Sequence, residues 1–171
     1  MQNYFELFDL ETSFFVDGEA LKKAYQAQVT RFHPDNFATK SQAERLQALQ
    51  NTSLLNSAYT ALKTPLNRAS YLLNLEDVNP FDEKDTKMDA NFLMSQIKLR
   101  EQLEGIKEQQ DSLALDDFIG RIQDFIRDNV ALISEAFGHS RDLQEIKTLV
   151  RELKFYEQLN KEANILMDEW L

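Results

Sequence analysis

Apolar residues recur at intervals of three and four positions along most of this 171-residue chain, which is the spacing of an amphipathic helix. The alternation of a half-buried strand is missing. Glycine (4) and proline (3) are scarce, so few positions interrupt the helical pattern. We therefore predict an all-α protein. The expected helices lie near residues 3–8, 17–33, 41–62, 64–73, 89–109, 113–137 and 142–171.

Residues suited to capping mark the ends of several of these helices. The N-cap candidates are Asn3, Asp17, Ser41, Thr64 and Asp89. The second helix should end near His33, because a residue that precedes proline avoids the α conformation, and Gly138 is a candidate stop for the sixth. In the third helix the expected stripe runs through Leu46, Leu49, Ser53, Asn56, Tyr59 and Leu62.

The composition changes between the fourth and fifth expected helices. Residues 76–89 contain six acidic side chains against two lysines, which leaves a local charge of −4, and they include Pro80. Such a stretch is typical of a linker. We predict a first unit over residues 1–75, an acidic linker over 76–88 and a three-helix bundle over 89–171, the last with Met88 and Leu93 spaced as a hydrophobic staple.

Charge and cysteine content narrow the functional classes. The formal net charge of −10 argues against nucleic-acid binding and against adhesion to anionic membranes. No apolar run approaches the ~20 residues of a membrane span, and the first ten residues contain two acids and no basic leader. The chain has no cysteine, so it forms no disulfide or thiolate metal site of its own. We expect a soluble cytoplasmic protein without a cofactor.

The tripeptide His33-Pro34-Asp35, below the HPD tripeptide, lies between two aromatic residues. A His/Asp pair can perform acid–base chemistry, but no obvious nucleophile or glycine-rich phosphate loop accompanies it. A metal site would need about three or four ligands, which one His and one Asp do not supply. Taken alone, the tripeptide is most simply interpreted as the end of a helix, with His33 satisfying a backbone carbonyl.

The residues around the HPD tripeptide are basic. Residues 20–40 carry a local charge of +3 within this acidic chain. Lys22, Gln26 and Thr30 lie on the side of the helix away from its apolar residues. A basic helix that ends in a stiff loop favours docking to an acidic partner surface, although two neighbouring lysines also suit an ordinary solvated face.

The stretches "LKKAYQAQVTRFHPDNF" and "LLNSAYTALKTPLNRASYLL" resemble a J-domain, the module by which co-chaperones engage a 70-kilodalton heat-shock ATPase. The resemblance covers about residues 1–75. It implies an antiparallel helix pair in which His33, Pro34 and Asp35 stimulate ATP hydrolysis by the chaperone. The docking residues that it implies are Lys22, Lys23, Gln26 and Arg31. Gln26 and Asn36 stand where many J-domains carry Arg and Lys, which suggests a specialised partner.

The helix expected from residue 90 to about 109 has two apolar faces. Phe92, Leu99, Leu103 and Ile106 form one stripe, and Leu93, Met94, Ile97 and Glu101 fall well around the other side at about 100° per residue. In the last helix Phe155 is about 200° from Leu153 and so lies off the main stripe. These residues are either an exposed patch or packed against another helix or the first unit, and periodicity does not decide between the two.

The order of "NYFELFDL", "PLNRASYLL", "DANFLMSQIKLREQLEGI" and "VRELKFYEQL" along the chain resembles the HscB family of iron–sulfur cluster biogenesis co-chaperones. The resemblance implies that the carboxyl bundle binds the cluster scaffold protein and brings it to a specialised heat-shock chaperone. It places the scaffold-binding patch on Leu93, Met94, Ile97, Glu101 and Phe155. Lys98 stands where a family member can have an acid.

These expectations describe an ATPase-stimulating co-chaperone without catalytic activity of its own. One alternative is a general folding co-chaperone, but neither a Gly/Phe-rich nor a zinc-binding segment follows the J-domain-like part. Another is a small helical enzyme that uses His33 and Asp35.

Overall fold

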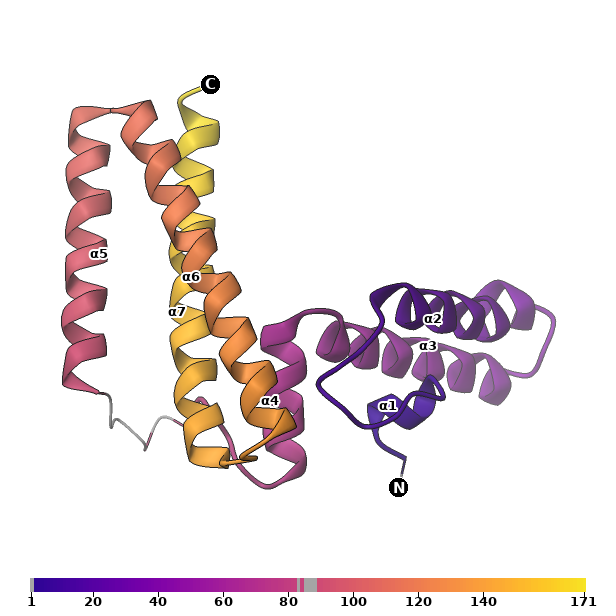
Figure 1. Ribbon diagram of the computed structural model, residues 1–171. Coiled ribbons are helices and arrows are strands. Elements are labelled where there is room, and N and C mark those ends of the chain that lie inside the picture. Colours follow the sequence, from indigo (N-terminus) through magenta and orange to yellow (C-terminus); the bar gives the residue numbers. More distant parts are fainter. Residues whose placement is uncertain (1, 83, 85–88) are drawn as a thin grey trace. The chain divides into compact units, whose positions relative to one another are not determined.

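The computed structural model describes residues 2–82, 84 and 89–171, and the described residues form seven α-helices and one 3-10 turn (Figure 1). The prediction of an all-α protein is confirmed. The chain divides into two compact units, Met1–Leu75 and Glu76–Leu171, so the division falls where the sequence placed the end of the first unit. Residues 83 and 85–88 of the predicted linker, with Met88 of the predicted staple, lie outside the described residues.

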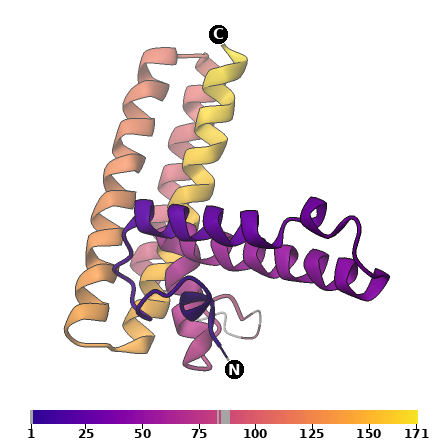
Figure 2. The ribbon, with the colours of Figure 1, turned by 90° about the vertical axis from the view of Figure 1, so that its right-hand side faces the viewer.

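The first unit is built on two antiparallel helices that lie side by side in both views (Figures 1 and 2). Its elements are α1 (Tyr4–Leu7), α2 (Gly18–Phe32), the 3-10 turn η1 (Pro34–Phe37), α3 (Gln42–Lys63) and α4 (Pro65–Leu75). Asn3 and Glu6 form the reciprocal capping box expected of their spacing. Asp17 and Ser41 accept hydrogen bonds from the first-turn amides of α2 and α3, so these predicted helix starts are confirmed.

Contacts between α2 and α3 fix where the HPD tripeptide lies. Tyr25 of α2 stacks on Tyr59 of α3 with ring centroids 4.2 Å apart, and its hydroxyl is hydrogen-bonded to Asn56. Ala58 is completely buried. The Asn-x-Ala-Tyr run of α3 therefore holds the helix pair together, and the α2–α3 connection projects from its end.

The buried stripe of α3 differs from the expected one. Ala48, Leu55, Ala58 and Leu62 are buried, whereas Leu46 and Leu49 are each 55% exposed. The prediction that the stripe begins at Leu46 and Leu49 is therefore wrong. Two alanines supply the first and third buried positions, and their small side chains did not stand out in the sequence pattern.

The second unit contains three long helices that run side by side (Figures 1 and 2). They are α5 (Ala90–Gln109), α6 (Ser112–Gly138) and α7 (Leu143–Glu169). Gln110 and Arg141 adopt positive φ in the two connections, and each is followed by an aspartate that caps the next helix. Helix α6 ends at Gly138 as predicted, although the left-handed residue is Arg141 and not the glycine.

One hydrophobic core joins all three helices of the second unit. Its buried members are Phe92, Leu99, Leu115, Phe118, Ile119, Ile122, Phe155, Leu159 and Ala163. Leu103 and Ile106 pack against this core while partly buried, so the predicted inner stripe of α5 is confirmed. Among the described residues, no helix is both long and apolar enough to cross a membrane.

Candidate functional site

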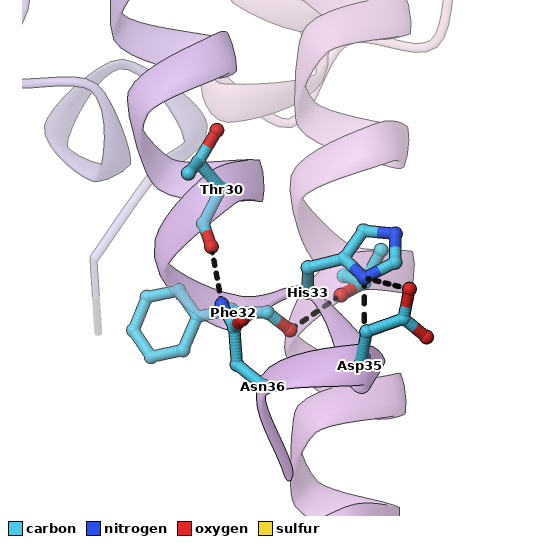
Figure 3. Close-up of polar contacts among 6 residues, drawn as sticks. Thr30, Phe32, His33, Asp35 and Asn36 are labelled. Carbon is cyan, nitrogen blue, oxygen red and sulfur yellow. Dashed lines mark hydrogen bonds and ion pairs between the residues drawn. The ribbon is translucent and has the colours of Figure 1, made fainter. Parts of the chain in front are cut away.

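The HPD tripeptide forms the link between α2 and η1. His33 has extended backbone dihedrals (φ −61°, ψ 134°) and caps η1, which begins at Pro34. Its Nδ1 accepts a 3.1 Å hydrogen bond from the Asp35 amide, and its carbonyl oxygen accepts a 3.0 Å bond from the Asn36 amide. The predicted end of α2 at His33 is confirmed, and the tripeptide is a compact, internally hydrogen-bonded turn (Figure 3).

These contacts determine which groups the tripeptide presents to solvent. Because Nδ1 of His33 accepts a hydrogen bond, the neutral imidazole carries its proton on Nε2. The Asp35 carboxylate lies 3.6 Å from Nδ1, and the side chains of His33 and Asp35 are 50% and 91% exposed. The turn therefore offers solvent an N–H donor from His33 and an exposed carboxylate acceptor from Asp35. Among the described residues, no group of three or more His, Asp or Glu side chains is arranged to hold a metal ion.

Two further side chains brace the turn from outside the tripeptide. The Asn36 amide nitrogen donates to the Thr30 carbonyl oxygen at 2.7 Å. The Thr52 hydroxyl of α3 lies 3.1 Å from the Phe32 carbonyl oxygen and 2.9 Å from that of Ala48. The sequence pattern gave no signal for Thr52, because its partner lies twenty residues earlier in the chain.

The predicted docking residues Lys22, Lys23, Gln26 and Arg31 are all exposed on α2. They do not share one face, since nine residues separate Lys22 from Arg31, which turns the second about 180° from the first. Arg31 instead lines a depression of about 300 Å³ that also includes Glu6 and Asp9. Lys22 and Gln26, four residues apart, do share a side of the helix.

The outward side of α5 carries the second candidate surface. Leu93, Met94 and Ile97 are 47%, 65% and 47% exposed, and Glu101 is exposed beside them. At about 100° per residue these four side chains span roughly 100° of the helix. We call them the α5 outer face. Their exposure favours the interpretation as a patch over packing against a neighbouring helix.

Phe155 does not belong to that exposed surface. It is only 8% exposed, and its ring meets the edge of Phe92 with centroids 5.8 Å apart. The Arg100 guanidinium lies 5.4 Å from the ring centroid and pairs with Glu162 at 3.1 Å. Of the two alternatives that periodicity left open, Phe155 therefore follows packing against another helix, because that side of α7 faces α5. It lies outside the exposed patch in which the resemblance placed it.

The comparisons with known proteins cover both units. The family model described as "HSCB C-terminal oligomerisation domain" matches residues 88–164. The chain is 37% identical over 170 residues to the "Co-chaperone protein HscB homolog" of Vibrio campbellii, with 99% of each chain covered. It is also 37% identical to the homolog of the same name from Photobacterium profundum, with 96% of each covered.

Solved structures agree with these sequence matches. Chaperone HscB from Vibrio cholerae superimposes with a TM-score of 0.88 at 37% identity, covering 99% of this chain and all of that one. Human co-chaperone protein HscB gives a TM-score of 0.89 at 27% identity, covering 96% of this chain and 81% of the human chain. The chain therefore belongs to the HscB family, the co-chaperones of iron–sulfur cluster assembly.

Proposed function

We propose that this protein stimulates the ATPase of a specialised 70-kilodalton heat-shock chaperone and delivers the iron–sulfur cluster scaffold protein to it. The observation that carries this proposal is the pairing of an exposed, braced HPD tripeptide on one unit with an exposed apolar face on the other. We further propose that it catalyses no reaction of its own and works in the cytoplasm. The metal cluster is the cargo of the scaffold, since this chain has no cysteine with which to hold it.

The chaperone would bind the first unit through complementary charge and a preformed turn. The Asp35 carboxylate suits the fork of a partner arginine, and the Nε2–H of His33 supplies a donor beside it. Lys22 and Lys23 face an acidic partner surface, with Gln26 as a polar contact and Arg31 on the opposite flank of α2. Pro34 limits the backbone freedom of the loop and so reduces the conformational entropy lost on docking.

The scaffold would bind the α5 outer face. Leu93, Met94 and Ile97 provide apolar contact area, and the flexible Met94 adapts to an irregular partner surface. Glu101 adds a negative charge at the edge of the α5 outer face, which would fix the orientation of the bound scaffold. In this proposal Phe155 supports the face from beneath, through Phe92, and offers the scaffold at most its exposed edge.

The test is ATP hydrolysis by the purified chaperone, together with a binding titration of the scaffold. Asp35→Asn should abolish stimulation while leaving scaffold binding and the thermal unfolding temperature unchanged, because the side chain is almost fully exposed. Leu93→Ala combined with Met94→Ala should weaken scaffold binding about tenfold or more while stimulation by the protein alone is kept.

Matched controls separate these effects from general damage. Asp116→Asn changes an exposed carboxylate on α6, and Leu113→Ala with Leu132→Ala removes two exposed leucines from the same unit. Both controls should behave as the native protein does. Stimulation that survives in Asp35→Asn, or scaffold binding that survives in the Leu93/Met94 variant, would contradict the corresponding half of the proposal.

A further inference from the structure

Two carbonyl groups in the last turn of α2 are hydrogen-bonded by side chains from outside the helix. The final carbonyl groups of a helix have no intrahelical donor and need partners from elsewhere. In α2 the Thr30 carbonyl receives the side-chain amide of Asn36, and the Phe32 carbonyl receives the hydroxyl of Thr52. Both of these carbonyl groups belong to the last three residues of α2, which precede the HPD tripeptide (Figure 3).

We propose that Asn36 and Thr52 are positioning residues that hold the HPD tripeptide in the geometry that stimulates the chaperone. The inference rests on the proposed function and adds two residues to it. Neither residue needs to touch the chaperone, because each acts on the backbone that carries His33 and Asp35.

Asn36 ties η1 back to α2 at two points. Its backbone amide donates to the His33 carbonyl at 3.0 Å, and its side-chain amide donates to the Thr30 carbonyl at 2.7 Å. The bond between the Asp35 amide and His33 Nδ1 lies within the loop that these two contacts close. At the position where many J-domains carry a lysine, this chain therefore has a contact that fixes the loop internally.

Thr52 ties the end of α2 to α3. It is half-buried, and its single hydroxyl proton lies within reach of two carbonyl oxygens, those of Phe32 and Ala48. The Ala48 carbonyl lies four residues back along α3, a common contact for threonine in a helix. The Phe32 carbonyl belongs to the other helix, so this second contact sets the distance between the helix pair where the HPD tripeptide begins.

The expected consequence is a loss of efficiency more than a loss of affinity. The cationic side of α2 is unchanged by either substitution, so docking of the chaperone is kept. Without its braces the turn samples other conformations, and only the fraction of complexes with the correct turn geometry stimulates hydrolysis. Maximal stimulation should therefore fall while the half-maximal concentration changes little.

The test uses the full chain with Thr52→Val, Thr52→Ser and Asn36→Ala. Valine keeps the β-branched shape of threonine but lacks the hydroxyl, and serine restores the hydroxyl. Thr60→Val, an exposed position on the same helix, is the matched control. Chaperone ATPase rates are measured over a range of co-chaperone concentrations, and amide hydrogen exchange at Asp35 is followed in the co-chaperone alone.

We expect Thr52→Val and Asn36→Ala to reduce maximal stimulation about three- to tenfold, with a half-maximal concentration within about twofold of native. The Asp35 amide should exchange faster in both, and Thr52→Ser and Thr60→Val should match the native protein. Native rates and native exchange in both variants would overturn the inference, as would a joint loss of affinity and thermal stability. Failure of the native protein to stimulate would overturn the proposed function as well, whereas native stimulation with unaffected variants overturns the positioning role alone.

Discussion

Glu152 of α7 carries a partly buried charge within the second unit. Burial raises the pKa of its carboxyl, and the charge of Asp89 adds to the rise. The carboxylate lies 3.5 Å from the side-chain amide of Asn129, which is itself buried. Because the pKa is higher in the folded than in the unfolded protein, ionised Glu152 destabilises the fold at neutral pH. That penalty is relieved as the pH falls through the folded pKa.

Replacing Glu152 with Gln should raise the free energy of unfolding at about pH 7, by less than about 1 kcal/mol because solvent screens this partly exposed side chain. Glutamine keeps an acceptor for Asn129 but removes the desolvated charge. The advantage should shrink as the pH falls through the raised pKa of the folded carboxyl, because the native side chain then takes up a proton and loses its charge. Urea denaturation at several pH values measures this difference in the free energy of unfolding. Glu104→Gln, at an exposed position on α5, is the control. An advantage that widened at low pH would contradict the assignment.

At the residue scale, the end of α2 could be predicted from the sequence, because Pro34 disfavours a helical conformation at His33. The His33 and Asp35 side chains on either side of Pro34 are exposed to solvent. Thr52, Asn129 and Glu152 could not be predicted in the same way. Each acquires its role from a residue on another helix, and a one-dimensional pattern contains no information about such neighbours.

At the scale of the element, α5 is anchored to α7 through aromatic side chains. Phe155 meets Phe92 edge to face, and Tyr156 meets the same ring with centroids 5.9 Å apart. The inner stripe of α5 then continues through Leu99. This anchoring turns Leu93, Met94 and Ile97 outward, because positions on one helix are fixed relative to each other.

Phe155→Ala should therefore destabilise the second unit by about 3 kcal/mol or more, the usual effect of removing a buried aromatic ring. Leu132→Ala, at an exposed position on α6, should change stability by less than about 0.5 kcal/mol. Urea denaturation monitored by circular dichroism distinguishes the two variants. If Phe155→Ala unfolded at the native urea concentration, the role given to Phe155 in the core would be wrong.

This result also determines how scaffold-binding data are interpreted. A loss of binding in Phe155→Ala would combine a missing contact with a displaced α5. The pair Leu93→Ala and Met94→Ala avoids that ambiguity, since both side chains are exposed.

Periodicity predicted the helices better than it predicted their buried faces. The inner stripe of α5 could be predicted because its members are large and lie at helical spacings: Phe92, Leu99, Leu103 and Ile106. The stripe of α3 was displaced because Ala48 and Ala58, which are buried, look neutral in a hydrophobic pattern, whereas the exposed Leu46 looks like a core residue. Phe155 lies off the main stripe of α7 because α7 packs against both α5 and α6, and a single apolar stripe does not describe both contacts.

At the scale of the whole molecule, the two candidate surfaces lie on separate compact units. Delivery requires the scaffold and the chaperone to be bound to the same co-chaperone, so one chain must carry both surfaces. A linked pair of sites raises the effective concentration of the second partner, which two independent molecules cannot do.

The most direct measurement is the scaffold concentration that gives half-maximal chaperone ATPase stimulation, compared for native protein and for an equimolar mixture of two variants. One variant is Asp35→Asn, which should still hold the scaffold. The other is Leu93→Ala with Met94→Ala, which should still stimulate the chaperone. We predict that native protein lowers the required scaffold concentration about tenfold or more and that the mixture does not. A mixture as effective as the native chain would contradict delivery by a single linked molecule.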